Sequence, residues 1–283
     1  VKALLPQCCI VLGGPEFLGD NEFFLHSNPF VSCVFRGEGE EVFPQWITHR
    51  NNPSEWKNIP GLCYLDSHGN YIDNDIARVR DFHHLVPPEK SRFFNWSKPF
   101  VQLETTRGCF NTCAFCVSGG EKPVRTLSIE AIRERLQIIH RHGIKNVRVL
   151  DRTFNYNTRR AKELLELFLE FAPDIRFHLE MHPALLSEEL KEELKRLPEG
   201  LLHLEAGIQS LREPVLVQSR RMGRLSDALE GLKFLCALPN METHADLIAG
   251  LPLYHLSEIF EDIRVLAEYG AGEIQLESLK LLP

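Results

Sequence analysis

The sequence predicts an α/β protein whose larger part is a partial barrel of six strand-helix units, a (β/α)6 barrel. From residue 100 onward, strand-like segments alternate six times with amphipathic segments, an order typical of a parallel sheet with right-handed crossovers. Within these strands every second residue on one side is polar, whereas a parallel strand covered on both faces is apolar on both. The chain has 283 residues, of which 43% are hydrophobic, so it can bury a core of this size.

The front part, residues 1–76, predicts a smaller α/β segment. Its first strand and glycine turn read CIVLGGPE, and a second strand, a helix and a strand pair read FVSCVFRGEGE, EVFPQWITHR and GLCYLDSHGNYID. Two parallel strands alone do not make a stable open sheet. We therefore expect partner strands upstream of these residues, and a chain that is a segment of a longer protein.

Residues 77–99 contain Pro87-Pro88 and no hydrophobic period, which indicates a linker. The larger part follows in residues 100–283, and its expected strands read FVQLETTRG, NVRVLDRTF, IRFHLEMHP, LLHLEAGIQS, METHADLIAG and EIQLESLK. Ser128 is the expected N-cap of the first helix. The apolar stripe of that helix is formed by Ile129, Ile132, Leu136 and Ile139, and that of a later helix by Leu190, Leu194 and Leu197.

Polar side chains at alternate strand positions define one face of this sheet. They are Gln102 and Glu104 on the first strand, His178, Glu180 and His182 on the third, His203, Glu205 and Gln209 on the fourth, His244 and Asp246 on the fifth, and Gln275 and Glu277 on the sixth. We expect this face to line the lumen of a curved, partly closed barrel that holds a polar small molecule, with the helices outside. An open sheet with one solvent-exposed face is the alternative.

Composition excludes several classes of protein. The formal net charge is −7, and the Lys and Arg residues are scattered singly, so nucleic acid is not expected as a partner. No apolar run approaches the roughly 20 residues that a membrane span needs, and we expect no membrane partner. Five of the 8 cysteines are scattered through apolar stretches, which is a poor disulfide framework and favours the reducing cytoplasm.

The other three cysteines, Cys109, Cys113 and Cys116, follow the first strand of the larger part. Three thiolates on one loop can bind three irons of a cubic iron-sulfur cluster, and the absence of a nearby fourth leaves one iron open to another ligand. The end of a barrel strand is also where such folds place their chemistry. A zinc site or free thiols are the alternative, although Cys109 lies one residue too far from Cys113 for the usual zinc knuckle.

The pattern Cys-x-x-x-Cys-x-aromatic-Cys, after the first strand of a six-unit (β/α) segment, resembles the radical S-adenosylmethionine (radical SAM) superfamily. The resemblance covers residues 100–283. It implies a [4Fe-4S] cluster whose open iron is chelated by SAM, and an external one-electron reductant of flavodoxin or ferredoxin type. It also implies that SAM is cleaved to a deoxyadenosyl radical, and that Phe115 lies beside the adenine.

Four further positions resemble one branch of that superfamily, which includes many cobalamin-linked members. By resemblance, SAM is contacted by Glu180 in HLEMHP, Gln209 in GIQS, the downstream Arg221 and Asp246 in ADLIAGLP. Relatives hold the SAM amino group with a glycine-rich turn after strand two, where this chain has Asp151. We expect the Asp151 side chain to accept from the ammonium in its place. His178 and His182 either face the substrate or fill the lumen as hydrogen-bonded side chains.

The front part resembles the latter half of the flavodoxin-like cobalamin-binding domain found before many radical SAM cores. Gly13 and Gly14 would allow close approach of the corrin's nucleotide tail, although a glycine turn after any such strand is the alternative. The cobalt-ligating pattern Asp-x-His-x-x-Gly is incomplete, because Asp66 and His68 are not followed by glycine at position 71. The resemblance therefore implies cobalamin for the full-length protein rather than for this chain.

Three functions follow from these features. The first is cobalamin-dependent methyl transfer to an unactivated carbon by a radical SAM enzyme. The second is hydrogen abstraction by the deoxyadenosyl radical without cobalamin, and the third is a non-catalytic iron-sulfur module. The substrate, a small molecule or a peptide, is not identified by the sequence, because specificity lies in loops and added domains.

Overall fold

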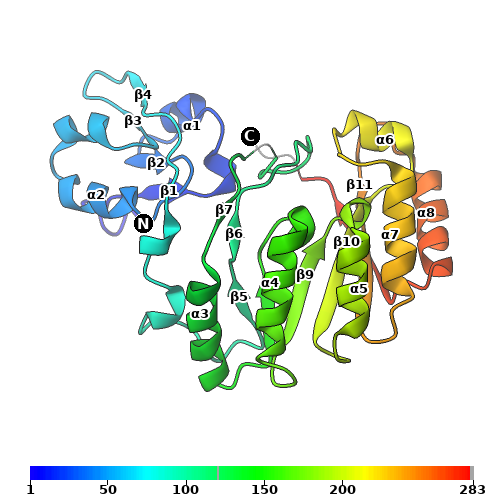
Figure 1. Ribbon diagram of the computed structural model, residues 1–283. Coiled ribbons are helices and arrows are strands. Elements are labelled where there is room, and N and C mark those ends of the chain that lie inside the picture. The colour runs from blue at the N-terminus through cyan, green and yellow to red at the C-terminus, as the bar shows by residue number, and fades with distance from the viewer. Residues whose placement is uncertain (120, 281–283) are drawn as a thin grey trace. The chain divides into compact units, whose positions relative to one another are not determined.

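Two separate sheets organise the chain (Figure 1). The computed structural model describes residues 1–119 and 121–280, which form two compact units, Val1–Leu85 and Val86–Lys280. The domain boundaries that we predict at residues 76 and 99 stay predictions.

The smaller unit is built on a four-stranded sheet. In order, its strands are β1 (Val11–Gly13), β2 (Cys33–Phe35), β3 (Leu62–Leu65) and β4 (Tyr71–Asp73). β1 and β2 are parallel, β3 pairs antiparallel to β2, and β3 and β4 form the expected hairpin. The hairpin thus extends the two parallel strands to a sheet large enough to cover a core. The helices are α1 (Glu22–Ser27) and α2 (Val42–His49), with 3-10 turns η1 (Pro15–Phe17) and η2 (Pro53–Asn58).

Aromatic packing forms the core of this unit on the α2 side of its sheet. Trp46 and Trp56 are buried with Phe35 and Tyr64 in one cluster, and the rings of Trp56 and Tyr64 meet edge to face with centroids 5.4 Å apart. β1 ends at Gly13, and the next residue, Gly14, has a φ of 102°, in the left-handed region that favours glycine. This conformation lets the chain leave the strand directly into η1.

The larger sheet has six parallel strands in the order β12-β11-β10-β9-β8-β5. These are β5 (Val101–Leu103), β8 (Asn146–Val149), β9 (Arg176–Met181), β10 (Leu202–Gln209), β11 (Glu242–Ala249) and β12 (Glu273–Ser278). Each strand lies beside the one before it in the sequence, as expected for successive right-handed crossovers. Because β5 and β12 are not paired with each other among the described residues, the barrel is incomplete, which confirms the predicted fold class.

Helices cover the outer face of this sheet (Figure 1). They are α3 (Ile129–Arg141), α4 (Thr158–Leu169), α5 (Glu188–Arg196), α6 (Glu213–Gln218), α7 (Leu225–Cys236) and α8 (Leu256–Glu268). The 3-10 turns η4 (Pro88–Lys90), η5 (Phe154–Tyr156) and η6 (Pro183–Leu185) belong to the same unit, whereas η3 (Phe82–His84) belongs to the smaller one. The Ser128 hydroxyl accepts from the Ala131 amide at 3.2 Å, which confirms the predicted N-cap of α3. Ile132, Leu136 and Ile139, on the apolar stripe of α3, are fully buried.

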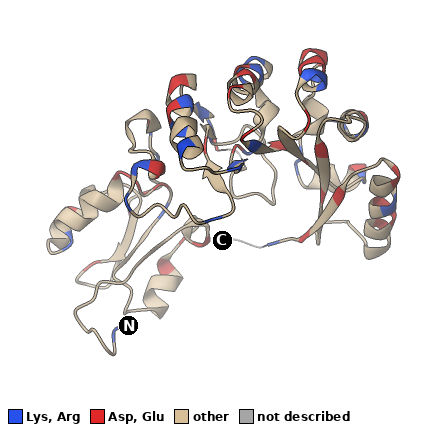
Figure 2. Cartoon of the chain, turned by 90° about the horizontal axis from the view of Figure 1, so that it is seen from below, with Lys and Arg blue, Asp and Glu red and all other residues tan. Residues whose placement is uncertain are grey.

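The strands bury alternate residues, as the polar pattern predicts. In β10, Leu202, Leu204, Ala206 and Ile208 are buried against the helices, and the residues between them are half-buried on the opposite, concave face. We call this concave polar face the lumen face. Seen from below, the strands curve away from the helices that cover them (Figure 2).

The segment that we predict to be a linker is partly folded onto both units. Val79 is buried in the smaller unit, and its amide donates to the Glu38 carboxylate at 2.6 Å. Glu89 is buried in the larger unit, where its carboxylate accepts from Arg135 of α3 at 2.8 Å. The absence of a hydrophobic period in this segment therefore did not mean an absence of tertiary contacts.

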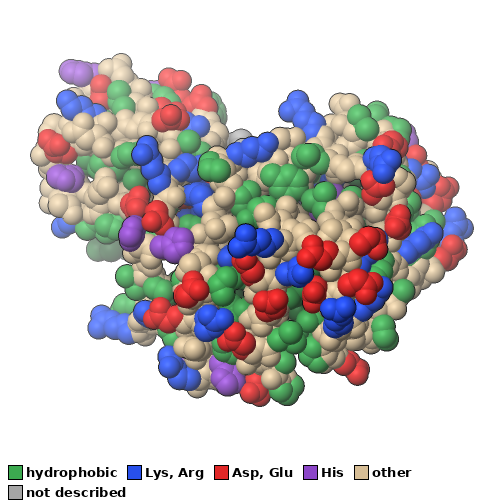
Figure 3. Space-filling model, viewed as in Figure 1, with side chains coloured by type: hydrophobic (Ala, Val, Ile, Leu, Met, Phe, Trp, Pro, Cys, Tyr) green, Lys and Arg blue, Asp and Glu red, His purple; other side chains and the backbone are tan. Residues whose placement is uncertain are grey.

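Charged side chains of both signs are mixed over the face of the larger unit drawn in Figure 3. This mixture gives no single basic stripe of the kind that follows a phosphate backbone. None of the helices in the described ranges is long and apolar enough to cross a bilayer.

Candidate functional site

The three cysteines lie on a loop at the carboxyl end of β5. A short hairpin, β6 (Thr106–Arg107) paired with β7 (Arg125–Thr126), closes the base of this loop. Cys109 donates its amide to Glu121 O at 3.0 Å, and Cys116 donates to Cys113 O at 3.2 Å. The turn is tight, because a Cβ on Gly119 would lie 2.6 Å from Cys113 O. Backbone bonds and a required glycine therefore hold the three thiols on one small loop.

The three thiols do not converge on a single point. Among the described residues, the groups of three metal-ligating side chains with all ligand atoms within 4.8 Å of one another do not include these thiols. A cubane binds each thiolate to a different iron, so it does not require the three sulfurs to meet at one ion.

The donor set leaves room for a fourth, external ligand. Cys236 is the remaining cysteine of the larger unit, and it ends α7 near the amino-terminal end of the sheet, away from the loop. Cys109 and Cys113 are buried, and Cys116 is half-buried. Burial raises the pKa of the Cys113 thiol, whereas the positive charge of Arg221 opposes the rise. A metal bound there would replace a proton.

Arg221 joins the loop to the end of β10. Its Nη1 lies 3.8 Å from Cys113 Sγ, and its Nη2 donates to Gly207 O at 2.6 Å. A Cβ on Gly207 would lie 2.8 Å from Gln209 Nε2 and 3.3 Å from Arg221 Nη2, so both side-chain ends lie directly beside Gly207. The structure thus brings three predicted residues, Cys113, Gln209 and Arg221, to one place.

The end of β10 is irregular where these residues meet. Gln209 has a φ of 74°, and the pairing of β10 with β11 shifts register between Gly207 and Gln209. Bulges of this kind re-aim side chains beside functional sites. The Ser219 carbonyl, just before Arg221, accepts from the Ala114 amide at 2.9 Å and so fixes this segment to the cysteine loop.

The lumen face also gathers the predicted acidic residues. Burial, followed by the charge of Glu205, raises the pKa of Glu180 to about 7, while Arg152 opposes the rise. Burial raises the pKa of Asp246 as well. Burial acts in the same direction on Glu205, but hydrogen bonds with His178 and Asp246 outweigh it and lower the pKa of that carboxyl. Neighbouring acids with such different affinities for a proton are typical of functional sites.

Asp151 has a use that the sequence did not indicate. It is buried, and its carboxylate accepts from the amides of Thr105 and Thr106 at 2.9 Å each, as well as from the Thr105 hydroxyl. These bonds tie the end of β8 to the segment that leads into the cysteine loop. The direct contact with an ammonium group stays a prediction, but the observed contacts give Asp151 a positioning role.

The remaining predicted residues lie at different levels of the sheet, with His178 nearer the amino-terminal end of β9 than His182. His182 is 3% exposed, and neither of its ring nitrogens has a hydrogen-bond partner among the described residues. Burial lowers the pKa of His182 to about 3, so the ring is neutral. His178 instead shares a 2.8 Å hydrogen bond with Glu205. Phe115 is partly buried against an apolar cluster that contains Val215, Leu251, Tyr254 and Ile259.

The sequence did not indicate residues whose role is a hydrogen bond with a backbone atom or a close approach that a larger side chain would fill. Asn155 holds the backbone of His182 with two hydrogen bonds, of 2.9 and 2.8 Å. Thr105, Gly207 and Ser219 also belong to this group. The GIQ run at residues 207–209 was the one signal that could have pointed to Gly207.

Comparison with known proteins defines the class of this site. Residues 103–266 match the family model of the radical SAM superfamily. The chain belongs to the radical SAM superfamily, a class of enzymes whose cofactors are a [4Fe-4S] cluster and S-adenosylmethionine.

Several methyltransferases are similar to this chain in sequence. It is 29% identical over 220 residues to an uncharacterised methyltransferase of Pyrococcus horikoshii, covering 73% of this chain and 46% of the relative. It is 26% identical over 251 residues to the hopanoid C-3 methylase of Methylococcus capsulatus, covering 84% and 46%. It is 22% identical to TokK of Streptomyces tokunonensis, a cobalamin-dependent radical SAM methyltransferase, covering 100% and 44%. The chain thus spans about half the length of these relatives.

Solved structures share the fold. The radical SAM methyltransferase TsrM of Kitasatospora setae, solved with cobalamin and a [4Fe-4S] cluster, has a TM-score of 0.74 at 16% identity, covering 97% of this chain and 56% of that one. The cobalamin-dependent radical enzyme OxsB has a TM-score of 0.68 at 21% identity, covering 90% and 38%.

Proposed function

We propose that Cys109, Cys113 and Cys116 bind a [4Fe-4S] cluster and that the lumen face beside them binds SAM. In this proposal the complete protein is a cobalamin-dependent radical SAM methyltransferase that acts on an unactivated carbon. The contact of Arg221 with both Cys113 Sγ and Gly207 O carries the proposal, because it joins the cysteine loop to the polar end of β10. When bound, the cluster supplies the electron that cleaves the sulfonium of SAM.

The chain's own residues bind and orient the cofactor. Arg221 can turn from Gly207 O to the carboxylate of SAM, since a guanidinium prefers a charged oxygen to a neutral one. Glu180 and Asp246 can accept from the ammonium and the ribose hydroxyls, and Gln209 from β10 offers both a donor and an acceptor. Phe115 offers an aromatic surface for the adenine.

Cobalamin-independent hydrogen abstraction is the second candidate. Its support is in the smaller unit, where Asp66 accepts from the amides of His68 and Asn70 at 2.8 and 2.9 Å and so builds the turn between β3 and β4. A carboxylate used in this turn does not position a histidine as a cobalt ligand. In this second candidate the smaller unit is either vestigial or docks the substrate.

The test is anaerobic reconstitution of the full-length protein, followed by reduction in the presence of SAM. Formation of S-adenosylhomocysteine that depends on added methylcobalamin supports methyl transfer, whereas 5'-deoxyadenosine alone supports the second candidate. If neither product forms, the chain is a non-catalytic iron-sulfur module.

Two variants test the assignments themselves. Cys113→Ala should lose the cluster, measured as iron content and visible absorbance, whereas Cys236→Ala, the control, should retain it. A complete cubane in Cys113→Ala would overturn the ligand assignment. Asp246→Ala should keep the cluster and weaken SAM binding in calorimetry, and unchanged affinity would remove Asp246 from the site.

A further inference from the structure

A second polar site lies at the opposite end of the larger sheet from the cysteine loop. An open cavity of about 400 Å³ is lined there by residues near the amino-terminal ends of the strands. They include Asn146 of β8, Arg176 of β9, His203 of β10, His244 of β11 and Glu273 of β12. The proposed function uses the carboxyl ends of the strands and leaves this cavity without a role.

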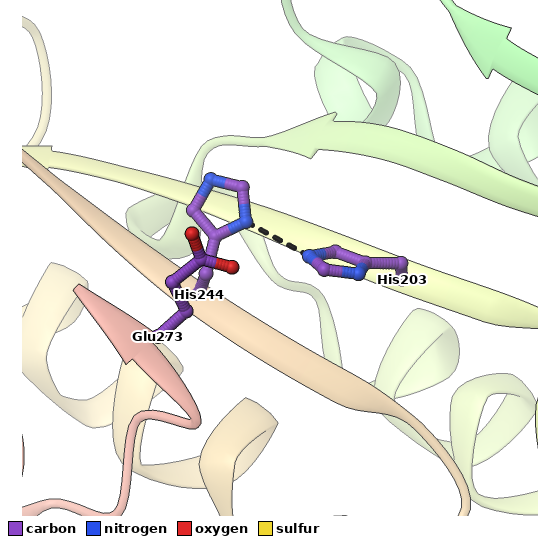
Figure 4. Close-up of side chains that lie close together, drawn as sticks. All are labelled: His203, His244 and Glu273. Carbon is purple, nitrogen blue, oxygen red and sulfur yellow. Dashed lines mark hydrogen bonds between the residues drawn. The ribbon is translucent and has the colours of Figure 1, made fainter. Parts of the chain in front are cut away.

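Three side chains in this cavity converge on one point. Ligand atoms of His203, His244 and Glu273 all lie within 4.8 Å of one another, and Figure 4 shows the three groups turned toward each other from neighbouring strands. His203 Nε2 lies 2.9 Å from His244 Nδ1. His244 and Glu273 are register partners on β11 and β12, so the sheet itself fixes them on the same face.

The far nitrogen of each histidine lies near a carboxylate. His203 Nδ1 is 3.6 Å from Glu242 Oε2. His244 Nε2 is 3.2 Å from Asp246 Oδ1 and 3.6 Å from Glu205 Oε2. Histidines that bind metals donate their other ring N–H to a carboxylate, which fixes the ring and raises its basicity. These carboxylates lie within reach of that role, although His244 Nε2 makes no hydrogen bond among the described residues.

We infer that His203 Nε2, His244 Nδ1 and the Glu273 carboxylate bind a divalent transition-metal ion of the zinc class. Two imidazoles and one carboxylate are the donor set of open, catalytic-type zinc sites. The fourth coordination position faces the cavity and is available to water or a small anionic ligand.

Proton positions must change when the ion binds. In the metal-free chain Arg176 Nη2 lies 3.2 Å from His203 Nδ1, so Nδ1 accepts and the proton of neutral His203 is on Nε2, donated to His244. Metal binding at Nε2 moves that proton to Nδ1, so the Arg176 guanidinium must turn away from Nδ1, and the Glu242 carboxylate, whose Oε2 lies 3.6 Å from Nδ1, can accept in its place. His244 keeps its proton on Nε2, facing Asp246.

The required movement is small. Tetrahedral zinc with bonds of about 2.0–2.1 Å separates two ligand nitrogens by roughly 3.3 Å. His203 Nε2 and His244 Nδ1 are 2.9 Å apart, so this separation must open by about 0.4 Å, and both rings must turn so that the two nitrogens point at one ion instead of at each other.

The test is Co²⁺ and Zn²⁺ binding to the full chain in which Cys109, Cys113 and Cys116 are all changed to serine, because the free thiols would also bind these ions. We expect one Co²⁺ per chain with visible absorption bands of tetrahedral cobalt, and displacement of Co²⁺ by Zn²⁺. His203→Gln and His244→Gln should each lower the affinity by more than about tenfold, whereas the control His49→Gln, in the smaller unit, should not.

Two outcomes overturn the inference. One is the absence of stoichiometric Co²⁺ binding in the chain that lacks the three loop cysteines, which would make the cluster a hydrogen-bonded histidine pair only. The other is unchanged affinity in both histidine variants. If either variant fails to fold, Glu273→Gln, on an exposed position of the edge strand, applies the same test. Since this chain has no iron-sulfur ligands, failure here is distinguishable from failure of the proposed function.

Discussion

Glu180 shows how a single residue in the lumen is set by its surroundings. Burial and the charge of Glu205 raise the pKa of its carboxyl to about 7, and Asp246 and Asp151 act in the same direction as Glu205. The residue therefore gains a proton over the pH range in which a surface glutamate is fully ionised. Ionising the buried Glu180 carboxyl at neutral pH therefore costs free energy. Binding of the cationic SAM can offset this cost, because a positive ligand favours the ionised carboxylate.

The first prediction concerns the pH dependence of Glu180→Gln. The folded state holds a proton on Glu180 between the unfolded pKa of about 4.5 and the folded pKa of about 7, so wild-type stability falls as pH rises through this window. Glutamine does not ionise, so the variant does not lose stability in this pH window. Relative to wild type, the variant should gain on the order of 1–3 kcal/mol in unfolding free energy between pH 5 and pH 8, measured by denaturant titration.

The control for this prediction is Glu199→Gln, at an exposed turn, which should change stability equally at both pH values. Glu180→Gln should also weaken SAM binding if Glu180 contacts the cofactor. A variant whose stability differs from wild type by the same amount at pH 5 and pH 8 would show that Glu180 is not a buried acid with a raised pKa.

The second prediction concerns Asp151→Ala. Alanine removes the acceptor of Thr105 N, Thr106 N and the Thr105 hydroxyl and leaves buried donors without a partner. We expect a loss of roughly 1–3 kcal/mol in unfolding free energy, together with reduced iron loading of the adjacent cysteine loop. Asp174→Ala, at a half-exposed ion pair with His140 and Lys145, is the control and should keep full iron content.

At the scale of elements, α7 is placed by a close approach to the backbone of η6. Gly231 lies on the buried side of α7, and a Cβ there would be 2.1 Å from Pro183 O. In an ordinary helix glycine costs about 0.5–1 kcal/mol relative to alanine. Here the glycine is required by packing, since only a hydrogen atom fits between the helix and the turn.

The third prediction follows from this contact. Gly231→Ala should lower the melting temperature instead of raising it, with a cost of roughly 1–3 kcal/mol because α7 must move away from η6. Gly39→Ala, where nothing lies within 4 Å of the added Cβ, is the matched control. Equal or greater stability of Gly231→Ala would mean that α7 is not seated against Pro183.

The elements that the sequence missed are short. The helices α1 and α6 have six residues each, too few for a propensity or a period to be visible above the surrounding sequence. Leu25 of α1 and Val215 of α6 are almost fully buried, so tertiary packing stabilises these helices. The strands β6 and β7 have two residues each. The long cysteine loop connects them, so no short turn motif marks this pair in the sequence.

At the scale of the whole molecule, a buried ion pair attaches the residues after the smaller unit to α3. Arg135 donates to Glu89 through Nε and Nη2, at 3.1 and 2.8 Å, and its Nη1 donates to Glu104 O at 3.1 Å. The Glu89 side chain is 0% exposed. Removing one partner of such a pair leaves an uncompensated buried charge, which is more costly than losing an exposed pair.

The fourth prediction tests this attachment. Glu89→Ala should destabilise the larger unit by about 3–5 kcal/mol, seen as faster hydrogen exchange of the α3 amides. The neighbouring Lys90→Ala removes an exposed pair with Glu134, 2.6 Å apart, and should cost no more than about 1 kcal/mol. Equal exchange rates in the two variants would show that the Glu89–Arg135 pair does not hold this segment.

The sequence by itself determined the class of fold and the candidate metal ligands. Strand alternation has a period of two, helix stripes a period of 3.6, and the three cysteines lie within eight residues of one another. Each of these signals is local, so each survives in the linear order of residues. The polar lumen face followed from the same periodicity.

Only the tertiary structure decided which distant residues meet. Arg221 reaches Cys113 across 108 positions of sequence, Asp151 supports Thr105 across 46, and His203 meets His244 across 41. These distances depend on strand register, on a bulge at the end of β10 and on close approaches at Gly207 and Gly231. A linear pattern shows which face a side chain occupies, but the partner it meets is set by how the neighbouring strands and helices pack in three dimensions.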